Sequence, residues 1–238
     1  MESYINSIFN DIRSQVEKDD ESREKIIKLS RSAIRKCSES IRAVHRRELN
    51  LASDMIESTK NDLLEIVSIL PTNGLFENNV SIAFQEYIEA LELFHFVSND
   101  SNESSPLLSL KFIQESIPIP YVAYLHGICD LVGELRRFTL DSIRLDDIKA
   151  AERSLNLMDE IFSQLITLDY PNALVPGIRR KTDLIRNLLE KTRGDLTFTH
   201  NRIALVEKLD KVLKISKVDS KIMTNLMTMS EDEEEENE

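Results

Sequence analysis

The chain has 238 residues, enough to bury a sizeable core, and 41% of them are apolar while 30% are charged. Five glycines, six prolines and no tryptophan favour long helices over a sheet. The formal net charge is −12, but seven of the acids lie in the last eight residues, so the rest is mildly acidic and a broad basic nucleic-acid footprint is excluded.

The N-terminal third predicts a long amphipathic helix. Apolar side chains such as Ile5, Ile8 and Ile12 recur at steps of three and four residues, and no Gly or Pro interrupts them. The polar stretch 17–24 is where this helix would divide, so the pattern fits one helix over 3–48 or two nearly continuous ones.

Later breakers divide the remaining chain into shorter helices. Pro71 and Gly74 end one helix, the Ser/Asn-rich segment 99–106 reads as a loop, and Gly194 is expected to break a late helix. The later helices are expected over 51–69, 79–97, a short 109–114, 121–143, 145–168, 178–193 and 205–215. We therefore predict an all-α fold with one helical domain over 1–215, followed by a flexible acidic tail over 216–238.

The cysteines and the apolar runs bear on the cellular compartment of the protein. Cys37 and Cys129 lack the spacing of a metal site or of a disulfide framework. Residues 1–13 show no signal-peptide core, and no apolar run approaches the roughly 20 residues of a membrane span. We expect a cytoplasmic protein, or a nuclear one if the source is eukaryotic, without membrane association.

Four carboxylates on two predicted helices are the most informative feature. Glu86 and Glu89 are three residues apart, and Asp130 and Glu134 are four apart, so each pair shares a helix face within an apolar segment. Hard oxygen ligands of this kind suit Mg²⁺ or Mn²⁺. Gly133 lies between Asp130 and Glu134 in the sequence, and its lack of a side chain would admit a close helix or a ligand.

Two other interpretations of these acids stay open on spacing alone. Glutamates three or four residues apart are common on solvated helix faces. Dinuclear carboxylate proteins use Glu-x-x-His on two helices, and Glu92 with His95 supplies one such pair, but we find no second copy. We expect His95 and His126 to be structural hydrogen-bonding residues.

The segments around these acids resemble a known family. The runs Gln85-Glu86-Tyr87-Ile88-Glu89-Ala90 and Asp130-Leu131-Val132-Gly133-Glu134-Leu135 resemble the translin family, and within it the translin-associated factor X (Trax) branch. The similarity covers roughly residues 20 to 195. The resemblance implies a bundle of seven helices and a hollow octamer that encloses RNA.

The resemblance also implies an activity. Trax-type subunits are Mg²⁺-dependent endoribonucleases, whereas translin subunits bind nucleic acid and lack the full acidic set. Glu86, Glu89 and Asp130 match the catalytic acids, and Glu134 matches a nearby acid expected as a fourth metal ligand. We therefore expect a Mg²⁺- or Mn²⁺-dependent endoribonuclease acting on single-stranded RNA, or on single-stranded regions of structured RNA. The alternatives are a non-catalytic nucleic-acid-binding scaffold of the translin type and a helical protein-interaction module.

Partners and RNA contacts follow from the same resemblance. The protein is expected to form a homo-oligomer, or a hetero-oligomer with a translin-like subunit, and the oligomer is expected to be octameric. Basic residues cluster at the end of the first helix and directly after the second acidic pair. We expect RNA-backbone contacts from Arg42, His45, Arg46, Arg47, Arg136 and Arg137. Arg179, Arg180 and Lys181 open a helix, where cations are disfavoured, which favours a phosphate or subunit contact.

Overall fold

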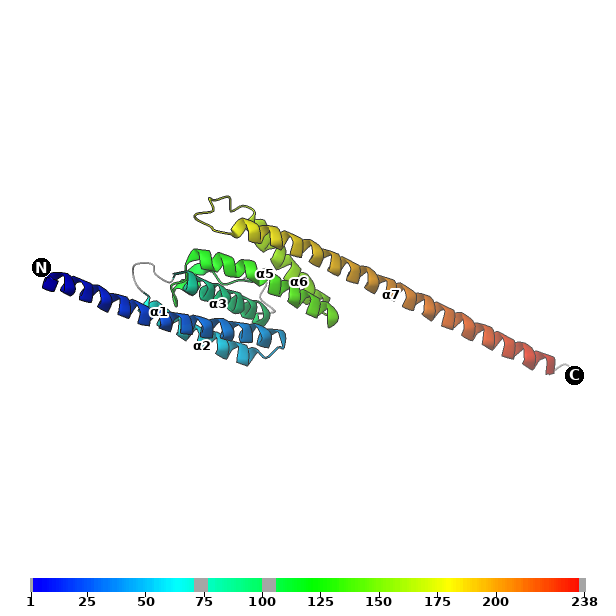
Figure 1. Cartoon of the computed structure of the whole chain (residues 1–238). Helices are drawn as coiled ribbons and strands as arrows, with labels where there is room; N and C mark the ends of the chain where they lie inside the picture. The colour runs from blue at the N-terminus through cyan, green and yellow to red at the C-terminus, as the bar shows by residue number, and fades with distance from the viewer. Residues whose placement is uncertain (1, 71–76, 100–105, 236–238) are drawn as a thin grey trace. The chain divides into compact units, whose positions relative to one another are not determined.

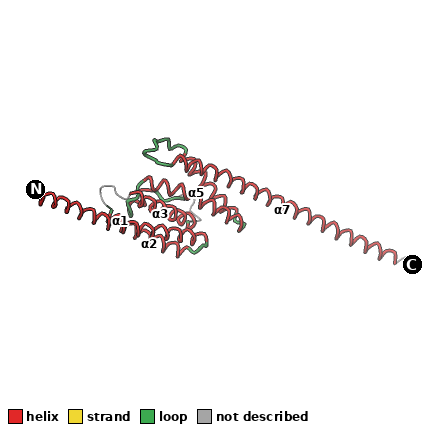
Figure 2. Tube along the Cα trace, in the orientation of Figure 1, coloured by secondary structure: helices red, strands yellow, loops and turns green. Residues whose placement is uncertain are grey.

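The computed structural model describes residues 2–70, 77–99 and 106–235, and is 85% helical with seven helices and no strand in these ranges (Figures 1 and 2). The all-α fold class is therefore confirmed. The predicted breaks at Pro71 and Gly74, and most of the 99–106 loop, lie outside the described residues. No helix in the described ranges is long and apolar enough to cross a membrane. The helices are α1 (Glu2–His45), α2 (Leu49–Ile69), α3 (Glu77–Ser98), α4 (Leu110–Gln114), α5 (Tyr121–Arg144), α6 (Ile148–Leu165) and α7 (Ile178–Glu235).

The chain divides into two units, Met1–Glu190 and Lys191–Glu238. In the first unit α1 packs on α2 and α3, α3 packs on α5, and α5 packs on α6. Buried side chains of α1 begin at Ile26 and continue through Ala33 and Cys37 to Val44. The polar stretch 17–24 does not divide this helix. The C-terminal half of α1 is therefore the part that enters the core, and its last residue, His45, contacts Glu134 of α5.

Two matching turns hold the ends of α1 and α5. Arg47 and Asp146 take left-handed backbone, with φ of 63° and 59°. In both turns the next amide reaches back five residues, from Glu48 N to Ala43 O and from Asp147 N to Ser142 O, each at 2.9 Å. This arrangement is a Schellman motif, which satisfies carbonyls at a helix end.

The second unit corrects one sequence prediction. Gly194 was expected to break a helix, but α7 is continuous past it, so this prediction is wrong. A glycine inside a helix costs only about 0.5–1 kcal/mol, which flanking helix formers offset. The structure continues α7 through 216–235, where the sequence predicts a flexible acidic tail. Four of the five residues in 231–235 are glutamates, which are good helix formers and favour helix in this last stretch.

Candidate metal centre

A close crossing of α3 and α5 builds the centre. A Cβ on Gly127 would lie 2.6 Å from Cβ of Ile88 and 2.8 Å from the carbonyl oxygen of Gln85. Only glycine allows this approach, because such distances are far below van der Waals contact. Ile88 itself is fully buried in the α3–α5 contact. The predicted acids of the two helices are thereby brought within one or two turns of the crossing.

Asp130 on α5 is held by two side chains. Gln85 of α3 donates from Nε2 to Asp130 Oδ2 at 2.5 Å. Lys181, in the first turn of α7, donates from Nζ to Oδ1 at 2.5 Å and to Oδ2 at 2.6 Å. The same ammonium group reaches the carbonyl of His126 at 3.3 Å. This lysine was singled out at sequence level for a phosphate or subunit contact, and in the structure it pairs with a predicted metal ligand.

The loop before α7 fixes the position of Lys181. His126 Nε2 donates to the carbonyl of Pro176 at 2.9 Å, so this histidine has the structural role that the sequence predicted. Gly177 turns the chain with φ of 76°, and its amide donates to Asn172 Oδ1 at 3.0 Å. The start of α7 is therefore anchored to the start of α5.

Glu134, one turn further along α5, meets the end of α1. His45 Nε2 lies 2.6 Å from Glu134 Oε2, and its side chain is only 4% exposed. Its other ring nitrogen, Nδ1, lies 3.9 Å from Asp141 Oδ2. Arg137 Nη1 is 3.6 Å from the same Glu134 oxygen. Both acids of α5 thus have cationic or potentially cationic partners.

Glu86 and Glu89 on α3 lack such partners in the described part of the chain. Burial is the main cause that raises the pKa of Glu89 to about 8, followed by repulsion from Glu86, Asp130 and Glu134. Burial also raises the pKa of Glu86, with Asp130 and Glu134 adding to the effect and Lys181 opposing it. The acids are therefore close enough for Glu86 and Glu89 to be repelled by the other members of the cluster. Lys181 offsets only part of this negative charge.

The donor set fits a divalent cation in chemistry. Within the described residues, no three His, Cys, Asp or Glu side chains converge tightly enough to hold an ion in this conformation, because Asp130 is turned to Lys181 and Glu134 to His45. Four buried or half-buried carboxylates with excess negative charge are nevertheless the environment that a hard cation stabilises. A metal would thus take up a charge that Lys181 neutralises in part.

A basic groove of about 560 Å³ borders this cluster. Gly133, Arg136, Arg137, Leu140 and Arg144 recur at helical spacing along α5, so they form one stripe beside the acidic stripe of Asp130 and Glu134. His45, the last residue of α1, and Arg46 after it also line the groove, as does one acid, Asp141 of α5. Four of the six predicted RNA-contacting residues therefore line one groove, and Arg144 joins them without having been predicted.

The other two predicted basic residues lie elsewhere. The Arg47 guanidinium lies 5.0 Å above the ring of Phe138, where it supports the turn after α1. Arg42 is exposed and does not line the groove. Arg179 pairs with Asp169 at 2.8 Å. Gly133 was expected to admit a close helix or a ligand. The close helix approach is at Gly127 instead, whereas a Cβ on Gly133 would meet nothing within 4 Å and the residue lines the groove.

The Glu92–His95 pair does not form a metal site. Glu92 is fully buried and accepts from the amide of Leu108 at 3.0 Å, while Tyr124 donates to the Leu108 carbonyl at 2.6 Å. His95 Nδ1 lies 2.9 Å from Asn99 Nδ2. Burial raises the pKa of Glu92 to about 8. This acid therefore fixes the segment before α4 against α3.

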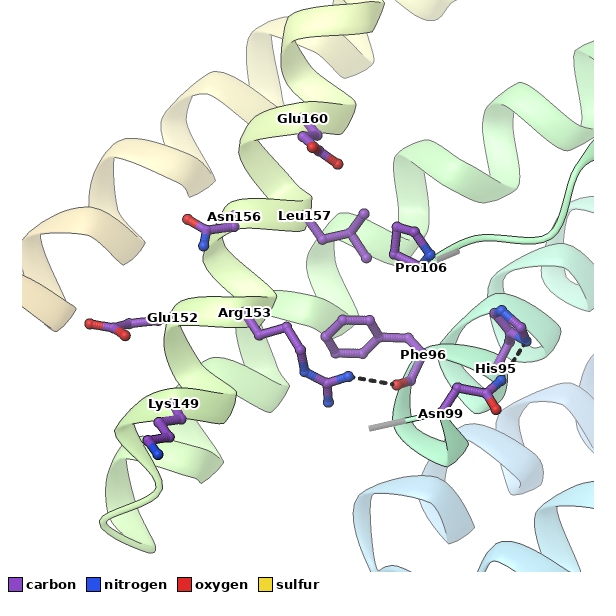
Figure 3. Close-up of a pocket in the computed structure, with 10 residues that line it drawn as sticks. All are labelled: His95, Phe96, Asn99, Pro106, Lys149, Glu152, Arg153, Asn156, Leu157 and Glu160. Atoms are coloured by element: carbon purple, nitrogen blue, oxygen red, sulfur yellow. Dashed lines mark hydrogen bonds between the residues drawn. The ribbon is translucent and has the colours of Figure 1, made fainter. Parts of the chain in front are cut away.

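A second pocket, of about 450 Å³, lies between the end of α3 and α6 (Figure 3). Arg153 donates from Nη1 to the carbonyl of Phe96 at 3.4 Å, and its guanidinium carbon lies 4.4 Å from the ring centre of Phe96. Lys149 and Glu152 of α6 also line this pocket. None of the four predicted acids lines this pocket, so it is separate from the candidate centre.

Comparison with known proteins agrees with the fold. The model of the Translin family matches residues 21–193. An uncharacterised protein of Methanocaldococcus jannaschii is 32% identical over 196 residues, which are 81% of this chain and 83% of that protein. A Translin-associated protein X homolog of Schizosaccharomyces pombe is 21% identical over 204 residues, covering 78% of this chain and 84% of that protein.

Solved structures show the same architecture. A complex of AfC3PO with duplex RNA superposes with a TM-score of 0.71 at 25% identity, covering 82% of this chain and 97% of that one. Apo-NeC3PO gives a TM-score of 0.70 at 21% identity, covering 80% and 96%. The family match includes both α3 and α5, which carry the four acids. This chain therefore belongs to the translin family.

Proposed function

We propose that the protein is a Mg²⁺- or Mn²⁺-dependent endoribonuclease that cleaves single-stranded RNA, or single-stranded regions of structured RNA, within a closed, octameric oligomer. One observation carries the proposal: the carboxylate cluster of α3 and α5, whose charge is only partly compensated, borders an arginine-lined groove on α5. A groove that attracts phosphates leads directly to acids that attract a divalent cation. The complex of the related AfC3PO with duplex RNA supports a nucleic acid as the ligand.

Glu86, Glu89, Asp130 and Glu134 would hold the metal. When bound, the ion supplies a water of lowered pKa and positive charge at the phosphorus. The remaining contributions come from the chain itself. Lys181 and Gln85 orient the Asp130 carboxylate, and His45 orients that of Glu134. Such supporting contacts are often worth 10- to 100-fold in metal affinity or activity, roughly.

The basic stripe would position the RNA. Arg136 and Arg144 line the groove, and Arg144 also donates to Asp141 at 3.1 Å. A guanidinium group suits phosphate because its donors have a fixed fork geometry. Arg137 lies within 4 Å of Glu134 at its Nη1, so it stands between the groove and the acids. A phosphate bound by this arginine would be adjacent to the carboxylate cluster.

RNA cleavage with Mg²⁺ tests the proposal directly. Glu89→Gln and Asp130→Asn should each lower turnover by about 100-fold or more, because a metal ligand contributes several kcal/mol to transition-state stabilisation. Glu160→Gln on α6, outside the cluster, is the matched control and should retain activity. Single-stranded, duplex and partly paired substrates of one sequence compare the forms of RNA. Equal cleavage by wild type and Asp130→Asn would refute the assignment.

A non-catalytic scaffold is the second candidate. Asp130 and Glu134 already have basic partners in Lys181 and His45, which favours a centre that needs no metal. This alternative predicts RNA binding in the absence of Mg²⁺ and no turnover when the ion is added. Filter binding beside the cleavage assay separates the two functions, and light scattering tests the closed oligomer that both require.

A further inference from the structure

The first turns of α1 present an unpartnered apolar seam. Ile5, Phe9, Ile12 and Val16 follow each other at steps of four, three and four residues, the spacing of a coiled-coil seam. Their side chains are 50–60% exposed, and this part of α1 extends past the other helices of its unit (Figure 1). We name these four residues the N-terminal seam.

A second seam lies on α7 in the other unit. Leu205, Leu209 and Val212 repeat the same spacing and are 53–61% exposed. Arg202 occupies the seam position before Leu205 and is also exposed. We name these four residues the C-terminal seam. Both seams lie outside residues 21–193, which the family model matches, so they are additions to the family domain.

The two segments have opposite charges. Residues 4–21 contain five acids and two bases, whereas residues 198–214 contain four bases and two acids, with histidine left neutral. Two copies of the acidic segment would repel one another, as would two copies of the basic one. The charges therefore favour pairing of unlike segments.

We propose that the N-terminal seam of one copy pairs with the C-terminal seam of a second copy as an antiparallel coiled coil. In this register Phe9 faces Val212, Ile12 faces Leu209 and Val16 faces Leu205. The next layer places Asp19 opposite Arg202, so the two charged seam residues form an ion pair.

The parallel arrangement of the same seams is less favourable. It would place Asp19 opposite Val212 and Phe9 opposite Arg202. A carboxylate facing an apolar side chain in a helix pair loses water without gaining a partner. One charged pair at the seam thus selects the antiparallel direction, as buried polar residues do in coiled coils.

Cysteine cross-linking in the full-length protein tests the contact. Val16→Cys and Leu205→Cys are made in separate chains with different tags and co-expressed, with the native Cys37 and Cys129 both buried. Mild oxidation should give a disulfide-linked dimer that carries both tags. Ser14→Cys, on the opposite side of α1, replaces Val16→Cys in the control and should give little of this product.

Charge reversal checks the register. Asp19→Arg should lower the mixed-tag product about tenfold or more, since like charges then face each other at the seam. Arg202→Asp alone should do the same, and the two reversals together should restore the product. Both positions lie on surface helices, and circular dichroism verifies folding of each variant.

Several outcomes would overturn the contact. Cross-linking of Val16→Cys chains to each other would show pairing of like segments. In a further variant that carries both cysteines in one chain, a link confined to single chains would show that the seams meet within one molecule. Failure of the double reversal to restore the product would reject the antiparallel register. RNA cleavage by the unmodified protein is a separate readout, so loss of this contact does not bear on the proposed nuclease.

Discussion

The two acidic pairs of the centre differ in their compensation. On α5, Asp130 is bound by Lys181 and Glu134 by His45. On α3, Glu86 and Glu89 are bonded to no cation among the described residues, and the pKa of Glu89 is about 8. The fold therefore supplies basic partners for only two of the four carboxylates, those on α5. Removal of an acid should therefore have opposite consequences on the two helices.

The largest expected effect concerns the crossing that joins the two pairs. Gly127→Ala would force a Cβ into Ile88 and the Gln85 carbonyl, so we expect a loss of about 1–3 kcal/mol in the free energy of unfolding. Gly133→Ala, on the same helix with open space around it, should be neutral or slightly stabilising. Urea unfolding of both variants measures this, and similar midpoints would contradict the close crossing.

Neutralising one acid of each pair sharpens the comparison. In metal-free protein at pH 8, Glu89→Gln should raise the free energy of unfolding, because a buried and repelled charge is removed. Asp130→Asn should lower it by about 1 kcal/mol, since Lys181 loses its partner. Chemical denaturation without Mg²⁺ measures both values. Changes of the same sign would show that the two pairs are not different in compensation.

The pH dependence of stability should reveal the raised pKa of Glu89. An unfolded carboxyl group loses its proton near pH 4.5, whereas folded Glu89 keeps it up to about pH 8. Between these values the folded state binds more protons, so metal-free stability falls as pH rises and levels off above about 8. Mg²⁺ should recover a few degrees of Tm at pH 8 and little at pH 6.

Glu92 provides the matched control for this effect. Its pKa is also about 8, so Glu92→Gln should flatten the same pH dependence. Because Glu92 bonds to the Leu108 amide outside the cluster, this variant should keep the Tm increase on adding Mg²⁺. Glu89→Gln should lose it. A Mg²⁺ response that survives in Glu89→Gln would place the ion elsewhere.

The smallest expected effect concerns the basic stripe beside the acids. Arg136→Ala and Arg137→Ala should each weaken single-stranded RNA binding several-fold and lower the slope of log affinity against log salt by about 0.7. Arg179→Ala, which removes an exposed arginine paired with Asp169, should leave both unchanged. Fluorescence anisotropy over a salt series provides the measurement. An unchanged slope would exclude these arginines from the interface.

The spacing of residues in the sequence predicted most of the helices and the helix faces that carry the acids. Glu86 with Glu89 and Asp130 with Glu134 follow helical periodicity, so their pairing required no knowledge of tertiary contacts. Their partners could not be predicted in this way. Lys181 is 51 residues from Asp130 and His45 is 89 residues from Glu134. Only the tertiary fold, which places the end of α1 and the start of α7 within hydrogen-bonding distance of α5, brings these groups together.

The glycines of α5 and α7 show the same limit. Gly127 and Gly133 both lie in α5, and the sequence gives no reason to prefer one as the crossing point. Gly194 has the composition of a helix breaker, yet helix formers on both sides keep α7 continuous. Such outcomes depend on neighbours in space or on summed propensity, which a single residue does not reveal.

The acidic and basic stripes of α5 share one rigid helix, and this constrains how the protein can change. Each residue inserted into or deleted from a helix rotates everything after it by about 100°. A one-residue change in length between Asp130 and Arg136 would turn the arginines away from the acids without altering any side chain. The helix should therefore tolerate many substitutions while its length stays fixed, whereas the first turns of α1, which lie outside the centre, can gain or lose residues at little cost to it.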